Sequence, residues 1–241
     1  DRTITAVVIG CGDAFINRYC ATLEQRVNLE TLKLIVADRW PIDKLAANKI
    51  ELAQKSGETD SATRLQTLYD KFRTMLARRP EYITYLDLSN KDDLLWYKRL
   101  TADIVFVLVP DDIHVWYAND WLKRATLVIV EKPYDRDVVS AQRFEQVLQQ
   151  MARVNGERFA FTNVVCVDHY LAKIAKYVLQ SENESLRRQI GAIKRIEFSL
   201  CEAGGVEPWR APALEAGMIY DLFCHVLAQA SPFIKLESFL S

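Results

Sequence analysis

The sequence predicts an α/β fold built on a doubly wound, mostly parallel sheet, and three observations support this prediction. Apolar runs of strand length alternate with helical patterns over about the first 165 residues. Two glycines, Gly10 and Gly12, directly follow the first run, and the acidic Asp38 follows the second. Strands separated by helices need crossover connections, which make the strands parallel and place helices on both faces.

The strand candidates are predominantly apolar runs, which is typical of parallel strands buried on both faces. They are residues 4–9, 32–37, 104–109 and 126–130, with 159–164 as a further candidate and a shorter strand near 82–86. The helical patterns between them cover residues 13–26, 44–55, 62–78, 112–123 and 137–153. The segment from about 40 to 80 holds two helices where one crossover would suffice, so we interpret it as an insertion.

We expect two domains, residues 1–164 and 165–241. In residues 165–241, the sequence pattern predicts a helix (168–180), a strand (192–200), an irregular segment and another helix (217–229). One such unit is too small to form a second sheet with a buried face. We therefore expect it to be the beginning of an α+β domain that is incomplete in this sequence.

Composition excludes several classes of protein. The 241 residues carry 31 Lys+Arg and 32 Asp+Glu, a net charge of −1, which offers no general attraction for nucleic acid or an anionic membrane. No apolar run has the ~18 residues that a membrane-spanning helix needs. The five cysteines and three histidines are scattered, without a metal-ligand spacing. We expect reduced thiols, no metal and a cytoplasmic protein.

The glycine pair predicts a dinucleotide-binding turn. In Gly10-Cys11-Gly12-Asp13, the glycines allow a tight turn and a close approach to a pyrophosphate, which would lie at the start of the next helix. Phe15 stands where the fingerprint has a third small residue, so the match is imperfect. A glycine turn in a sheet that binds no cofactor is the alternative.

The end of the second strand and its neighbourhood complete the predicted cofactor site. Asp38 can accept hydrogen bonds from an adenosine ribose, whereas Arg39 can attract a 2′-phosphate, so NAD and NADP both stay open. We add Pro110, which follows the strand at 104–109, to the cofactor-binding residues.

A second motif, Glu131-Lys132-Pro133, ends the strand at 126–130. Carboxyl ends of strands face the ligand crevice of open α/β sheets. A lysine there can hydrogen-bond both a nicotinamide cofactor and a substrate hydroxyl, although a solvated surface lysine has the same pattern.

The glycine turn, this Glu-Lys-Pro motif and the two segments described below together resemble the Gfo/Idh/MocA oxidoreductases and the related glucose-6-phosphate dehydrogenases. The resemblance implies that Lys132 bridges substrate and nicotinamide, and that Glu131 and Pro133 bind the cofactor. It covers most of the chain except the insertion.

Residues 167–173, Val-Asp-His-Tyr-Leu-Ala-Lys, resemble the DHYLGK motif of glucose-6-phosphate dehydrogenases, with Ala172 in place of glycine. The resemblance implies that His169, Tyr170 and Lys173 bind a substrate phosphate and that Asp168 pairs with the catalytic histidine. A helix N-cap followed by a partly buried His and Tyr is the structural alternative.

Residues 205–207, Gly-Val-Glu, are similar to the same sugar-phosphate family, which implies that Glu207 contacts sugar hydroxyls. Asp221 and His225 are four residues apart on a predicted helix, so both side chains point the same way. They resemble the Gfo/Idh/MocA pattern G-x-x-x-D-x-x-x-H, which implies that His225 takes the hydroxyl proton while Asp221 orients it. In glucose-6-phosphate dehydrogenases the histidine would fall at Val226.

Together these features predict an NAD(P)-dependent oxidoreductase that moves a hydride between nicotinamide and a hydroxyl or ketone of a sugar-like substrate, phosphorylated or not. The resemblance also implies a homo-oligomer, with no nucleic-acid or membrane partner. Two alternatives stay open. One is a nucleotide-sensing or scaffold protein that retains the dinucleotide site without turnover, and the other is an NAD-assisted lyase or hydrolase.

Overall fold

The computed structural model describes residues 3–20 and 31–131, with short stretches at 139–140, 142–143, 146, 160–161, 171–173, 176, 225–226, 228–230 and 232–233. The chain divides into two compact units, Asp1–Phe161 and Thr162–Ser241. The sheet and its helices belong to the first unit.

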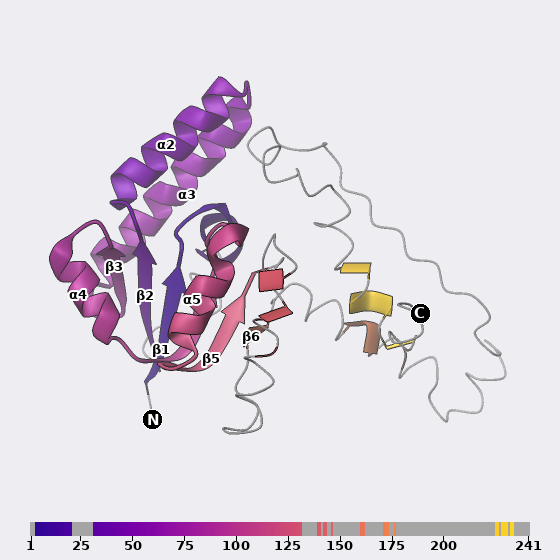
Figure 1. Cartoon of the computed structure of the whole chain (residues 1–241). Helices are drawn as coiled ribbons and strands as arrows, with labels where there is room; N and C mark the ends of the chain where they lie inside the picture. Colours follow the sequence, from indigo (N-terminus) through magenta and orange to yellow (C-terminus); the bar gives the residue numbers. More distant parts are fainter. Residues whose placement is uncertain are drawn as a thin grey trace. The chain divides into compact units, whose positions relative to one another are not determined.

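Within the described residues, six strands form one parallel sheet in the order β3-β2-β1-β4-β5-β6 (Figure 1). They are β1 (Ile4–Ile9), β2 (Leu32–Asp38), β3 (Ile83–Asp87), β4 (Ala102–Val107), β5 (Ala125–Val130) and β6 (Ala160–Phe161). The chain winds outward from β1 in both directions, so the order reverses between β1 and β4. This confirms the predicted doubly wound sheet of the Rossmann type, whose ligand crevice lies at that reversal, beyond the carboxyl ends of the strands.

Helices cover both faces of the sheet, which is why its strands are predominantly apolar. In β1, Val7 and Ile9 belong to one buried cluster, whereas Ala6 and Val8 belong to the cluster on the other face. The first cluster lies under α4 (Lys91–Arg99) and α5 (His114–Trp121). The second lies under the π-helical turn η1 (Phe15–Tyr19), α2 (Ile42–Lys55) and α3 (Thr59–Arg78).

Some predicted boundaries were wrong, and one helix was missed. Helix α4 has a strong local signal at its start, since the Asn90 side chain accepts from the backbone N–H groups of Asp92 and Asp93. The predicted strand 104–109 starts and ends two residues earlier, at Ala102–Val107. The predicted helix 112–123 begins instead as a 3-10 turn, η3 (Asp111–Ile113), followed by α5.

The predicted insertion is a helical hairpin. Figure 1 shows α2 and α3 running side by side and extending beyond the end of the sheet. The base of the hairpin packs onto the sheet, because α2 contributes Ala46 and α3 contributes Tyr69 and Phe72 to the buried cluster beneath it.

Candidate functional site

The glycine turn between β1 and η1 is shaped first by the fold. Gly10 has a φ of 97°, a conformation that side chains rarely adopt. A Cβ atom on Gly10 would lie 2.6 Å from the backbone oxygen of Leu108. Gly12 is different, because a Cβ there would meet no atom of the described residues within 4 Å. Gly10 is therefore needed for the close approach of β1 to the residues after β4, whereas Gly12 leaves open space at the start of the helix.

Asp38 connects this turn to the end of β2. Its Oδ2 accepts a hydrogen bond from the backbone N–H of Cys11 at 2.8 Å, and its Oδ1 accepts one from Trp40 at 3.2 Å. Burial raises the pKa of Asp38, and the two N–H bonds and the charge of Arg39 act against that rise. The carboxylate predicted to bind a ribose is thus also a structural support of the glycine turn.

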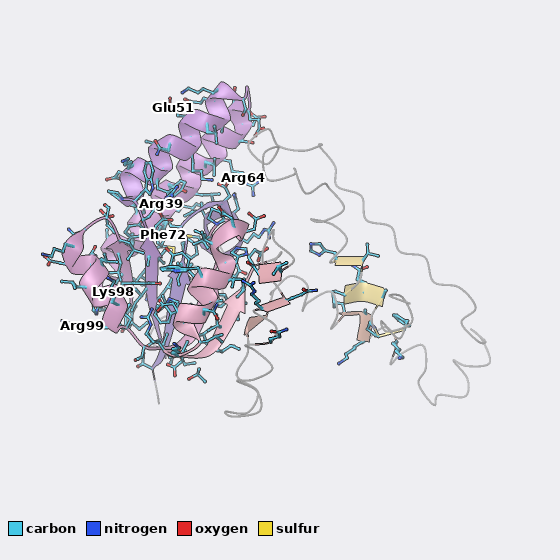
Figure 2. All side chains as sticks on the ribbon, viewed as in Figure 1. Arg39, Glu51, Arg64, Phe72, Lys98 and Arg99 are labelled. Atoms are coloured by element: carbon cyan, nitrogen blue, oxygen red, sulfur yellow. The ribbon has the colours of Figure 1, made fainter. Side chains whose placement is uncertain are left out.

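Helix α3 holds the same turn from the other side. The Tyr69 hydroxyl donates to the carbonyl oxygen of Cys11 at 3.1 Å. Phe72, labelled in Figure 2, meets the fully buried Phe15 edge to face, with 5.1 Å between ring centres. Phe15, which made the fingerprint imperfect, is therefore a core residue, and it begins the π-helical turn η1.

Asp13 lies at the beginning of the helix, where a pyrophosphate is predicted. Its Oδ2 lies 3.2 Å from Nζ of Lys49, which comes from α2. Its Oδ1 is buried and has no hydrogen-bond partner within the part of the chain that the structure describes. The negative charge of Asp13 would oppose a phosphate, and Lys49 offsets it. Nothing in the sequence pattern identified Lys49 or Tyr69, which lie 36 and 58 residues from their partners.

Glu131, predicted to bind the cofactor, is buried directly after β5. Its backbone N–H donates to Val107 at 3.0 Å, and its Oε1 lies 3.2 Å from Nη1 of Arg18. Its Oε2 and the hydroxyl of Tyr19 are buried, and neither has a hydrogen-bond partner among the described residues. Burial raises the pKa of Tyr19, and the charge of Glu131 raises it further. Polar groups therefore collect at the carboxyl end of β5.

The residues after β4 lie next to the glycine turn, since the backbone N–H of Leu108 donates to the carbonyl oxygen of Ile9 at 2.8 Å. Pro110 precedes η3, and its carbonyl oxygen accepts from Ile113 N–H at 3.2 Å. His114, which no sequence motif indicated, is buried at the start of α5, and its Nε2 donates to the carbonyl oxygen of Val109 at 2.7 Å. Burial raises the pKa of Tyr117 on α5, the charge of Asp38 adds to this, and the charge of Arg39 opposes it.

The structure thus brings together the predicted residues at the ends of β1 and β2, and it describes Pro110 and Glu131 at the ends of their strands. In the second unit, His225 is half-buried and Lys173 is exposed. The remaining predicted residues lie outside the described part of the chain: Lys132, Pro133, Asp168, His169, Tyr170, Glu207 and Asp221. In the described residues, no group of three or more His, Cys, Asp or Glu could hold a metal ion. No helix among these residues is long and apolar enough to cross a membrane.

Comparison with known proteins gives only distant structural likeness. No family model and no curated protein matches the chain. Solved structures similar to it include apo scyllo-inositol dehydrogenase from Lactobacillus casei (14% identity, TM-score 0.44, covering 73% of this chain and 41% of that one). The WlbA dehydrogenase from Chromobacterium violaceum, in complex with NADH and UDP-GlcNAcA, is similar at 17% identity (TM-score 0.43, 75% and 42%). KijD10, a 3-ketoreductase from Actinomadura kijaniata in complex with NADP, is similar at 19% identity (TM-score 0.43, 74% and 43%).

The chain spans less than half the length of these structures. Its fold class is established by its own strand order.

Proposed function

We propose that the chain carries the cofactor site and part of the substrate site of an NAD(P)-dependent oxidoreductase. The observation that carries this proposal is the turn after β1, where Gly12 leaves open space beside the Asp38 carboxylate at the sheet's reversal point. In parallel sheets with this strand order, a pyrophosphate binds at such a turn and a ribose at the acidic residue. Residues 1–164 would bind the dinucleotide and residues 165–241 would contribute to the substrate site.

The residues present fit such a cofactor. Gly12 lets a phosphate approach the backbone, Lys49 compensates the charge of Asp13, and Arg39 is exposed beside the ribose position. Figure 2 shows Arg39 near the base of the α2–α3 hairpin. A bound nicotinamide would accept or donate the hydride.

The chain's own residues would then position the substrate and move one proton. Lys132 would hold the reacting hydroxyl, and His225 would take its proton during oxidation or return it during reduction. Asp221, with Asp168, would orient the imidazole of His225 and stabilise its protonated form. The sugar-like substrate would be bound by His169, Tyr170, Lys173 and Glu207.

The test begins with binding. NAD⁺ and NADP⁺ are titrated into the protein by calorimetry, and absorbance of the reduced cofactor is followed with a panel of sugars, inositols and sugar phosphates. We expect binding of a dinucleotide and reduction with at least one substrate. The proposal would be overturned if neither NAD⁺ nor NADP⁺ bound to the protein.

The role of His225 has its own test. His225→Asn should lower kcat by about two orders of magnitude or more and leave dinucleotide affinity nearly unchanged, because general-base catalysis contributes about 10²–10⁴-fold. The control is Lys55→Gln, an exposed lysine of α2 paired with Glu51, which should behave as wild type. Equal activity in the asparagine variant would remove His225 from this role.

One observation favours a second candidate, a nucleotide-sensing protein that binds a dinucleotide without turnover. Phe15 fills the core where the fingerprint has a small residue, so the turn departs from the fingerprint. Dinucleotide binding without reduction on every substrate would support this candidate over the enzyme.

A further inference from the structure

The exposed side of α3 repeats its residue types every seven positions. Arg64, Lys71 and Arg78 form one row along the helix, which we call the cationic row, and Thr67 and Thr74 form a second row beside it. Seven residues make nearly two helical turns, so the members of a row lie on one side of the helix at intervals of about 10.5 Å. All five side chains are exposed, and Figure 2 shows Arg64 on α3.

The packing of α3 does not account for this repeat. The buried residues of the helix are on its other side, where Tyr69 holds the glycine turn and Phe72 packs against Phe15. An exposed helix face that serves only solubility needs polar residues but no fixed spacing between them. The seven-residue spacing therefore indicates a requirement outside the fold of the first unit.

The cationic row also lacks counter-charges. Among the residues that the structure describes, none of its three members forms an ion pair. By contrast, Lys49, Lys55 and Arg73 of the same hairpin each pair with a carboxylate. Asp70, which precedes Lys71, pairs with Arg73 at 2.6 Å. An acidic partner could therefore bind the row without breaking an ion pair that the structure describes.

A groove of about 360 Å³ follows the same side of the helix. The described residues that line it include Thr67, Lys71, Thr74, Met75 and Arg78. They all belong to α3 and span about 16 Å of its length, so the groove fits an elongated segment better than a compact small molecule. Met75 gives the groove an apolar and adaptable surface against which an apolar side chain can pack.

The threonine row is suited to close contact with another helix. The hydroxyl of Thr67 donates to the carbonyl oxygen of Thr63 at 3.0 Å, and that of Thr74 donates to Asp70 at 2.8 Å. Both hydroxyls therefore keep a hydrogen bond when water is excluded from the groove. Their side chains are short, so a neighbouring helix could approach α3 between the longer cationic side chains.

From this arrangement we propose that the exposed side of α3 binds an acidic helical segment of a partner protein. A helix that packs alongside α3 presents its own side chains at the same seven-residue interval. Glutamates at that interval would pair with the cationic row, and an apolar side chain would contact Met75 in the groove. The inference does not depend on the proposed oxidoreductase function.

The charge that would select this partner is local. The whole chain has a net charge of −1, so no general positive field would attract an acidic protein. Exposed ion pairs are individually weak and are screened by salt. We therefore expect a reversible complex that weakens as salt is added, and whose specificity depends on the spacing of the acidic residues.

The experiment uses the whole chain and a synthetic, fluorescently labelled helical peptide of about three heptads. The peptide carries glutamate at every seventh position and leucine on the same side. Fluorescence anisotropy measures its dissociation constant at two salt concentrations. A peptide of the same composition in scrambled order is the first control, and we expect it to bind at least about fivefold less tightly.

The variants separate the row from its charge. A protein that combines Arg64→Gln, Lys71→Gln and Arg78→Gln should bind the peptide about tenfold or more weakly. The matched control combines Lys91→Gln, Lys98→Gln and Arg99→Gln, which removes the same charge from exposed positions of α4. It should keep nearly full affinity. Thr74→Trp, which fills the groove without changing the charge, should also weaken binding, and circular dichroism checks that each variant is folded.

Four results would overturn the proposal. They are absence of peptide binding at about millimolar protein, equal binding of the scrambled peptide, an equal loss in the α4 control, and tighter binding of a single-stranded oligonucleotide through the same row. The last result would identify the row as a general polyanion site. Saturable binding that requires both the glutamate spacing and the cationic row would support the proposal.

Discussion

The two glycines of the turn after β1, compared with Gly57 between α2 and α3, separate the requirements of the fold from those of ligand binding. Gly10 combines a φ of 97° with a backbone oxygen 2.6 Å from the position of a Cβ atom. Gly57 has a φ of 80° but open space around it, and Gly12 has open space without a positive φ. Alanine would therefore add backbone strain and a steric clash at Gly10, backbone strain alone at Gly57, and neither at Gly12.

The expected magnitudes follow from these differences. The left-handed conformation costs an alanine about 1–2 kcal/mol, which sets the loss for Gly57→Ala. Gly10→Ala adds the displacement of Leu108, whose N–H donates to Ile9 at 2.8 Å, so its loss should reach about 3–5 kcal/mol. Gly12→Ala should cost less than about 1 kcal/mol. Urea unfolding followed by circular dichroism measures all three.

The same series tests the ligand site. Gly12→Ala fills the space through which a phosphate would approach, so it should weaken dinucleotide binding at least about tenfold while the protein stays folded. The structural reasoning would be refuted if Gly10→Ala were no more destabilising than Gly57→Ala. The functional reasoning would be refuted if Gly12→Ala bound dinucleotides as tightly as wild type.

Three further substitutions test buried hydrogen bonds. Tyr97→Phe removes the acceptor 2.7 Å from Nε1 of the fully buried Trp121, and should lower the free energy of unfolding by about 1–3 kcal/mol in urea titrations. Tyr69→Phe removes the hydroxyl that holds Cys11, and should cost about 1 kcal/mol and weaken dinucleotide binding measured by calorimetry. The pKa of Asp38 is higher in the folded protein than the ordinary aspartate value of 3.8. Deprotonation of Asp38 therefore lowers the free energy of unfolding as the pH rises above that value. The stability of wild type relative to Asp38→Asn should therefore decline from about pH 4 toward neutrality in thermal unfolding, and a rising difference would contradict the pKa direction.

Strands β1 and β2 could be predicted because their central residues are buried on both faces of the sheet. Ile4–Ile9 matches the apolar run to the residue, and Leu32–Asp38 differs by one residue at its end. The π-helical turn beginning at Phe15 was not predicted, and Phe15 packs there against Phe72 of α3, a contact that no local pattern indicates. Helix α4 was missed because it is short, with only Tyr97 fully buried.

The candidate site could be predicted only where its functional residues directly follow a strand in the sequence. Gly10, Gly12 and Asp38 directly follow apolar strands, so their pattern shows their position. Lys49 and Tyr69 reach the same turn from helices of an apparent insertion, and no local spacing relates them to it. The role of Asp38 as a support for Cys11 N–H likewise depends on the parallel register of β1 and β2.

The α2–α3 hairpin contacts the glycine turn. Because of these contacts, opening of the hairpin and binding of a ligand at the turn are linked equilibria. A ligand that requires the turn in this conformation also favours the hairpin state that holds it through Tyr69 and Lys49. At about 100 times its dissociation constant, such a ligand would stabilise the folded unit by about 2.7 kcal/mol. Amide protons of the hairpin would then exchange with solvent more slowly. Hydrogen exchange in α2 and α3 would therefore report ligand binding at the glycine turn.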